Sequence, residues 1–183
     1  AANKIFELAR GLTKDDLAVC LISGGCSALL SLPADGIELE EKRSLTQELL
    51  HSGATIHEMN CVRKHLSKIK GGKLTKAIYP AKVLTFCISD VPGDELYTIG
   101  SGPTVPDPTQ LKDAVNIIKK YQMSPSEKIL QYLSNPENET PKTDDPVFRN
   151  TQISLIATPQ LALQAAVNEA NKFGVNALVL GDA

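Results

Sequence analysis

The sequence predicts an α/β fold in which a mostly parallel sheet is covered by helices on both faces. Short apolar runs typical of buried strands alternate along the chain with amphipathic segments of helical period. Aromatic residues make up 4% of the 183 residues and Trp is absent, so the core is aliphatic, as is usual for α/β domains. The first apolar run ends in a glycine-rich turn that leads into a helix start, which is typical of a strand–turn–helix unit.

Four apolar runs are expected to form the strands. They lie at residues 17–22, 81–88, 152–157 and 175–180. Their nearly continuous apolar character is typical of parallel strands that are buried on both faces. Together with the intervening helices they predict a Rossmann-like three-layer sandwich.

The helices are expected at residues 3–11, in a short stretch ended by Pro33, and at 40–52, 55–70, 107–121, 124–134 and 158–174. Their boundaries rest on start and stop signals. Thr55 and Glu58 have the spacing of a capping box, and Asp107 followed by Pro108 places an N-cap residue before a proline at the first helical position.

The composition is that of a globular protein with no affinity for polyanions. A net charge of -2 provides no basic field, so neither nucleic acid nor a membrane is expected as a partner. No apolar stretch approaches the roughly 18 residues of a membrane span, and no signal peptide is visible. Four cysteines without C-x-x-C spacing are best explained as reduced thiols in a cytoplasmic protein.

The ends of the sequence suggest an incomplete domain. The chain opens within a helical pattern and stops directly after the predicted strand 175–180. We therefore expect residues 1–183 to be part of a larger α/β domain. Sheet edges that the rest of such a domain would cover favour self-association.

The turn at residues 23–27 is the strongest candidate for a binding site. Gly24 and Gly25 allow positive φ and the close approach of an anion, and Ser23 and Ser27 add hydroxyl donors. A buried strand that leads into such a turn points backbone N–H groups outward at a positive helix N-terminus, where a phosphate or a carboxylate can bind. A plain tight strand–helix turn is the alternative.

The polar side of the predicted helix 55–70 is a second candidate. It carries Asn60, Arg63 and Lys70 together with further cations. A solvated face is the ordinary interpretation of such a charge run. A binding role requires an anion opposite this face, and the turn at 23–27 is a candidate for holding one.

Two segments that follow the second predicted strand complete the candidate site. Asp90 and Asp94 lie where ligands bind in open α/β sheets, and two carboxylates four residues apart are suited to a hard divalent cation. An Asp-rich turn is the alternative. The next loop contains Ser101, Gly102 and Thr104, which provide either a second anion-binding backbone or a surface linker.

Six sequence blocks together resemble the two-domain glycerate kinases, which phosphorylate glycerate at its 2-hydroxyl. The blocks are S-G-G-C-S-A-L at 23–29, S-G-A-T-I at 52–56, N-C-V-R-K-H-L-S at 60–67, K-G-G at 70–72, S-D-V-P-G-D at 89–94 and S-G-P-T at 101–104. One departure is Cys26, where the family's loop commonly has a third glycine. The resemblance also implies an earlier N-terminal α/β segment that contributes a lysine, and a smaller C-terminal domain, both outside this sequence.

The resemblance implies an ATP-dependent kinase with Mg²⁺, whose small-molecule substrates are glycerate and ATP. Asp90 and Asp94 would hold Mg²⁺ and orient the attacking hydroxyl, with Asp90 as the base. Arg63, Lys70 and Asn60 would face the cleft. The residues that would bind nucleotide phosphates or the glycerate carboxylate are Ser23, Gly24, Gly25, Ser27, Ser101, Gly102 and Thr104.

Two other functions stay open. A nicotinamide-dependent hydroxypyruvate reductase is a label attached to some similar sequences, but the G-x-G-x-x-G fingerprint of dinucleotide binding is absent. The other is a non-catalytic phosphate-binding fragment of the kinase, in which the same residues bind without turnover.

Overall fold

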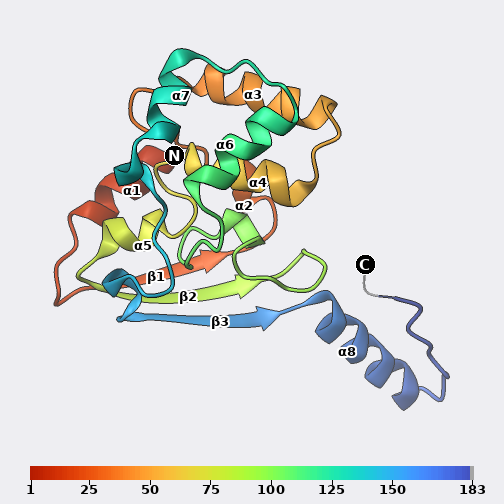
Figure 1. Ribbon diagram of the computed structural model, residues 1–183. Coiled ribbons are helices and arrows are strands. Elements are labelled where there is room, and N and C mark those ends of the chain that lie inside the picture. The colour runs from red at the N-terminus through yellow and green to blue at the C-terminus, as the bar shows by residue number, and fades with distance from the viewer. Residues whose placement is uncertain (182–183) are drawn as a thin grey trace.

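The computed structural model describes residues 1–181 and contains a three-stranded parallel sheet with helices on one face (Figure 1). The strands are β1 (Leu17–Ile22), β2 (Lys82–Ile88) and β3 (Thr151–Ala157), in the order β1-β2-β3. Ile22 pairs with Cys87, so the carboxyl ends of β1 and β2 lie at the same edge of the sheet. The predicted α/β fold with a parallel sheet is confirmed.

Eight α-helices and three short 3-10 helices accompany the sheet in the described part of the chain. They are α1 (Ala2–Arg10), α2 (Cys26–Leu29), α3 (Leu39–His51), α4 (Ile56–His65), α5 (Lys73–Ile78), η1 (Ile99–Ser101), α6 (Leu111–Lys120), α7 (Glu127–Ser134), η2 (Pro136–Asn138), η3 (Pro146–Phe148) and α8 (Pro159–Lys172). Within residues 1–181, none of the helices combines the length and the hydropathy that crossing a bilayer requires.

The core has two main parts. Helices α3, α4, α6 and α7 pack together around buried residues that include Leu49, Leu66 and Ala114. Helices α1 and α5 pack on the sheet, where Phe6 and Val83 are among the buried residues. Figure 1 shows the four-helix group above the sheet, with α1 and α5 at one side.

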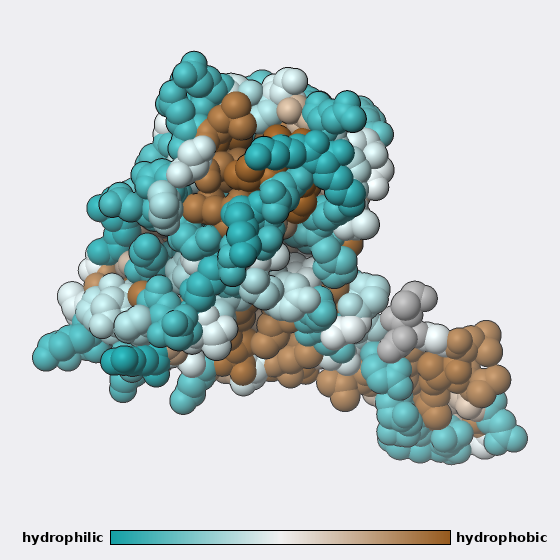
Figure 2. Space-filling model, in the orientation of Figure 1, coloured by the Kyte–Doolittle hydropathy of each residue, from teal (hydrophilic) through white to brown (hydrophobic). Residues whose placement is uncertain are grey.

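The opposite face of the sheet is left uncovered by the described residues. Leu17, Val19 and Leu21 of β1 point to this face and are 57%, 55% and 78% exposed. Brown apolar surface runs along the sheet in Figure 2. Residues 1–181 therefore form two of the three predicted layers.

The prediction of a fourth strand at 175–180 is wrong, because these residues form no strand. Helix α8 has no buried residue, although an inward face was expected, and it extends away from the sheet beyond the end of β3 (Figure 1). A parallel strand needs a connecting helix that packs back onto the sheet. Without that packing, Leu178 and Leu180 are 81% and 91% exposed.

The helix predicted to continue to residue 70 ends at His65. The Ser67 hydroxyl donates to the carbonyl of Leu32 at 3.1 Å and accepts from the N–H groups of Ile69 and Lys70, each at 3.3 Å. These side-chain hydrogen bonds compete with the helical pattern and end it. The short helix α5, which the sequence did not predict, follows.

Two predicted helix starts are shifted. Gln110 and Asp113 form the capping box of α6, so the helix does not begin at Asp107. The Asp107 carboxylate instead accepts a hydrogen bond of 2.5 Å from Lys64. Helix α7, expected to start at residue 124, is capped by Ser126. By contrast, the capping box of α4 forms as predicted.

Candidate active site

A pocket of about 360 Å³ lies at the carboxyl ends of β1 and β2, where segments far apart in the sequence meet. The β1–β2 register makes the turns after these strands neighbours. The lining residues come from the turn after β1 (Ser23, Gly25, Cys26, Ser27), from α4 (Ile56, His57, Asn60, Arg63), from the turn after β2 (Asp90, Val91, Pro92) and from the η1 segment (Thr98, Gly100). Six of the predicted site residues thus line one pocket: Ser23, Gly25, Ser27, Asn60, Arg63 and Asp90.

The glycines of the turn are required by its geometry. Gly25 has φ of 79°, in the left-handed region that favours glycine, and it caps the start of α2. A Cβ at Gly24 would lie 2.7 Å from Oδ2 of Asp90. At position 24, a residue with a side chain could not approach the Asp90 carboxylate as closely as glycine does.

Ser27 joins the cations to the turn. Its Oγ accepts hydrogen bonds from Arg63 at 2.9 Å and from Lys70 at 3.1 Å, and its carbonyl accepts from Lys70 at 2.7 Å. Since a hydroxyl has two acceptor lone pairs and one proton, the Ser27 proton is left for Ser101 Oγ, 2.7 Å away. The solvated-face interpretation is wrong for Lys70, which is 2% exposed.

Two cations, Arg63 and Lys70, lie next to Ser27. Burial lowers the pKa of Arg63. Burial, followed by the charge of Arg63, lowers the pKa of Lys70 to about 8. In the described part of the chain, neither cation has a carboxylate partner within ion-pair distance. Burial raises the pKa of the Cys26 thiol, although Lys70 opposes this shift, so the thiol is protonated at neutral pH.

The two predicted metal-binding carboxylates differ in position. Asp90 is exposed at the pocket. Asp94 has φ of 55°, and its Oδ1 is buried without a hydrogen-bond partner among residues 1–181. It does not line the pocket. No three His, Cys, Asp or Glu side chains of the described residues gather as a metal site. Mg²⁺ commonly uses one or two carboxylates together with substrate phosphates, and an exposed Asp90 fits that donor set.

Gly102 and Thr104 lie behind the pocket and do not line it. Thr104 is 1% exposed; its hydroxyl accepts a hydrogen bond from Thr85 at 3.1 Å and its carbonyl accepts one from Thr75 at 3.2 Å. A Cβ at Gly102 would lie 2.8 Å from the Val105 side chain. These two predicted ligands pack the loop that holds Ser101, which is itself 0% exposed and does not line the pocket.

Lys42 is a residue at this site that the motifs did not identify. It lines a smaller pocket of about 200 Å³ that shares Ser27, Arg63 and Lys70 with the region described above. Lys42 lies on the buried face of α3 with Leu45 and Leu49. The sequence contained one signal for this: Lys42 takes the first position of an i, i+3, i+7 pattern that Leu45 and Leu49 continue, and this pattern is typical of the buried face of a helix.

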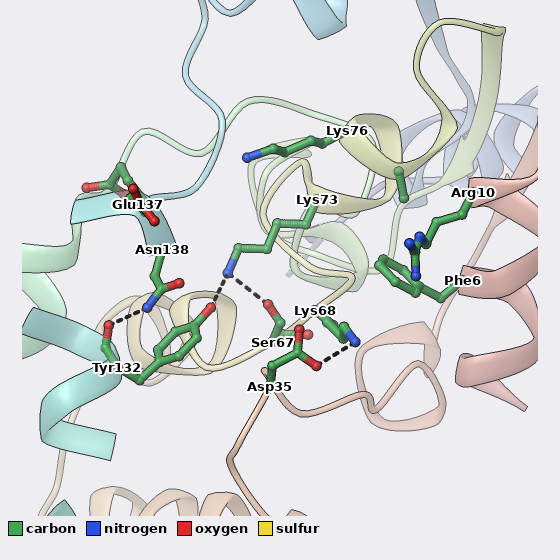
Figure 3. Close-up of a pocket in the computed structure, with 12 residues that line it drawn as sticks. Phe6, Arg10, Asp35, Ser67, Lys68, Lys73, Lys76, Tyr132, Glu137 and Asn138 are labelled. Atoms are coloured by element: carbon green, nitrogen blue, oxygen red, sulfur yellow. Dashed lines mark hydrogen bonds and ion pairs between the residues drawn. The ribbon is translucent and has the colours of Figure 1, made fainter. Parts of the chain in front are cut away.

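A further pocket of about 420 Å³, shown in Figure 3, also contains several cations, and two of them are bonded within the protein. Lys68 forms an ion pair of 2.6 Å with Asp35. Lys73 donates to the carbonyl of Ser67 at 2.8 Å and to the hydroxyl of Tyr132 at 3.3 Å. Unlike the smaller pocket beside Lys42, this one is also lined by carboxylates, which belong to Asp35, Glu137 and Glu139.

Comparisons with known proteins agree with the motif resemblance. Residues 1–134 match the family described as "Domain of unknown function (DUF4147)". The chain is 51% identical over its whole length to an Agrobacterium vitis protein that carries the provisional name hydroxypyruvate reductase, and it covers 41% of that protein. It is 40% identical, over 97% of its length, to the D-glycerate 2-kinase of Thermotoga maritima, of which it covers 41%.

A solved structure shows the same fold. The crystal structure of glycerate kinase from Thermotoga maritima superposes with a TM-score of 0.88 at 40% identity, over 98% of this chain and 42% of that one. The chain thus spans about two-fifths of the length of these relatives. Because the family match covers most of the chain and the fold agrees, the chain belongs to the DUF4147 domain family and is a homologue of glycerate kinases.

Proposed function

We propose that the protein containing this chain is an ATP-dependent kinase that phosphorylates glycerate at the 2-hydroxyl. The observation that carries this proposal is the meeting of the glycine turn, Arg63 and Asp90 in one pocket at the carboxyl ends of two parallel strands. Phosphoryl transfer depends mainly on positioning and on neutralising negative charge. The names of relatives such as the Thermotoga maritima D-glycerate 2-kinase support the same choice.

In the proposed reaction, the 2-hydroxyl oxygen of glycerate forms a bond to the γ-phosphorus of ATP as the bond to ADP breaks. The hydroxyl proton passes to the Asp90 carboxylate, which lies exposed at the pocket. Mg²⁺ would supply charge neutralisation to the phosphates of ATP. We assign Asp90 to hold it, with Asp94, which lies outside the pocket lining, as the second carboxylate.

The cations have distinct roles in this proposal. The Arg63 side chain has five N–H donors. It donates to the side-chain oxygens of Asn60 and Ser27, and its remaining N–H groups are available for an oxyanion. Lys70 donates to Ser27 and so orients the turn while adding positive charge. The backbone N–H groups of the turn provide the phosphate contacts.

Phosphorus NMR of the full-length protein with Mg·ATP tests the proposal. A new phosphomonoester signal that requires glycerate is expected. Asp90→Asn and Arg63→Ala should each lower kcat by about 10²- to 10⁴-fold, whereas the exposed control Lys112→Gln should not. Wild-type turnover in both site variants would refute the assigned roles.

Two alternatives give different results in related assays. The name of the Agrobacterium vitis relative favours a reductase as the second candidate. Oxidation of a reduced nicotinamide cofactor by hydroxypyruvate, without phosphorylated product from glycerate, would support it. For the 183-residue chain alone, ATP signals that broaden without product would indicate a phosphate-binding fragment that needs the rest of the protein for turnover.

A further inference from the structure

Lys42 is a buried cation whose partner the fold does not provide. The residue is 6% exposed, and its Nζ has no hydrogen-bond partner among residues 1–181. It also forms no ion pair within the described chain. Burying a charged group without a partner is costly, so native proteins rarely do so without a functional reason.

The surroundings of Lys42 increase that cost. The pocket of about 200 Å³ next to it is lined by Arg63 and Lys70 and has no carboxylate among its lining residues. Arg43 also lines the pocket, but it lies at the exposed rim and pairs with Glu40 at 3.4 Å. Three buried or half-buried cations thus converge on one small space to which residues 1–181 contribute no anion.

We propose that Lys42, Arg63 and Lys70 together bind a compact oxyanion, the phosphoryl or carboxylate group of a small substrate or product. This inference rests on the proposed function and adds Lys42 to the binding residues of that site. Ser27 and Arg63 line both this pocket and the larger one beside Asp90. A ligand can therefore place its charged group near Lys42 and its reacting group near Asp90.

The size of the pocket and its free donors favour a small anionic group. Sites for drug-sized ligands usually measure about 300–1,000 Å³, so a pocket of about 200 Å³ matches a phosphoryl or carboxylate group better than a nucleoside. Lys42 contributes three unused N–H donors. Burial, followed by the charges of Lys70, Arg63 and Lys73, lowers the pKa of Lys42 to about 7, and an anion would reverse this shift.

Isothermal titration calorimetry of the full-length protein tests the proposal in two arms, one with inorganic phosphate and one with glycerate. Lys42→Met should raise the dissociation constant of at least one anion by about 10- to 100-fold, as expected for a lost charge-assisted hydrogen bond. The control Lys112→Gln removes an exposed charge and should leave both constants unchanged. The arm that changes tells whether the pocket takes the phosphoryl or the carboxylate group.

A second measurement does not depend on the folding of a variant. In wild-type protein with ¹³C-labelled lysine, the side-chain resonance of Lys42 should titrate with a midpoint near pH 7. The midpoint should move to higher pH at a saturating concentration of the anion that binds. An unmoved titration overturns the proposal. So do anion affinities of Lys42→Met within twofold of wild type, or no saturable binding of either anion by wild type.

The outcomes also separate this inference from the proposed function. Phosphorylated glycerate formed by a protein whose anion affinity is insensitive to Lys42→Met would overturn only the role of Lys42. Lys42-dependent anion binding without any phosphorylated product from ATP and glycerate would overturn only the kinase proposal.

Discussion

Replacing Lys64 with Met is predicted to destabilise the protein far more than the loss of a surface charge. Lys64 Nζ lies 2.5 Å from Asp107 Oδ1, and the two side chains are 3% and 0% exposed. Nζ also lies 5.5 Å from the centre of the Tyr97 ring. Without Lys64, the N–H and the hydroxyl of Thr109 are the hydrogen-bond donors that residues 1–181 still provide to the buried Asp107 carboxylate.

The expected cost follows from the burial of the pair. Removing one partner of a buried ion pair costs about 3–5 kcal/mol, compared with about 0–1 kcal/mol for an exposed pair. With a urea m-value of about 2 kcal/mol/M, the unfolding midpoint should fall by roughly 2 M. The double variant Lys64→Met/Asp107→Leu should recover most of the loss, because apolar residues of similar volume often replace a buried pair at little cost.

The pH dependence gives this prediction a second check. Burial by itself raises the pKa of Asp107, but Lys64 and then Thr109 outweigh burial and lower it. In wild type, this carboxylate therefore stabilises the fold above its unfolded pKa of about 3.9, and the contribution is lost as the pH falls through the lower folded value. In Lys64→Met burial dominates, so the folded pKa rises and the cost of the substitution should shrink in acid.

Urea unfolding followed by circular dichroism at pH 7 and at pH 5 measures both effects. Lys172→Met is the matched control, because Lys172 pairs with Glu169 at 2.7 Å while the two side chains are 70% and 58% exposed. The reasoning would be refuted if Lys64→Met lowered the midpoint no more than the control. It would also be refuted if the cost at pH 7 were under about 1 kcal/mol.

Other substitutions test the glycine turn, a helix start and the buried lysine. Gly24→Ala should lower kcat for glycerate phosphorylation by about 10²-fold with an unchanged circular dichroism spectrum, because its Cβ would lie 2.7 Å from Oδ2 of Asp90; an unchanged kcat contradicts this. Thr55→Ala should lower the free energy of unfolding by about 1 kcal/mol, since the hydrogen bond from the Glu58 N–H is lost, and Thr55→Ser should retain most of the stability. Because the folded pKa of Lys42 is about 7 against 10.5 when unfolded, stability should rise with pH across that window. Lys42→Met should flatten the rise, and equal slopes in unfolding experiments would count against the buried charge.

Local patterns predicted the elements whose signals are local. The first three strands are read from apolar runs, and the start of α4 from Thr55 and Glu58, which lie within one helical turn. The end of α4 was missed because Ser67 is held by the carbonyl of Leu32, which is distant in the sequence. The fourth strand was predicted wrongly because apolar residues form a strand only when a neighbouring strand accepts their hydrogen bonds.

The residues of the candidate site likewise fall into those that the sequence predicted and those whose positions required the structure. Motifs and the rule that ligands bind at the carboxyl ends of parallel strands were enough to predict Ser27, Arg63 and Asp90 as neighbours. They were not enough to show that Ser101 and Thr104 are both buried, Ser101 against Ser27 and Thr104 against Thr85. The side on which a loop residue lies depends on the elements that pack against the loop.

By itself, the sequence determined that this protein has a parallel α/β sheet, a glycine turn after its first strand and the polar residues of the candidate site, because composition, period and turn chemistry are properties of neighbouring residues. Only the tertiary structure decided that Lys64 is paired, that Lys70 bonds to Ser27 and that Lys42 is buried without a partner among residues 1–181. The physical reason is that burial and charge pairing depend on atoms a few ångströms apart in space, which residues far apart in the sequence provide.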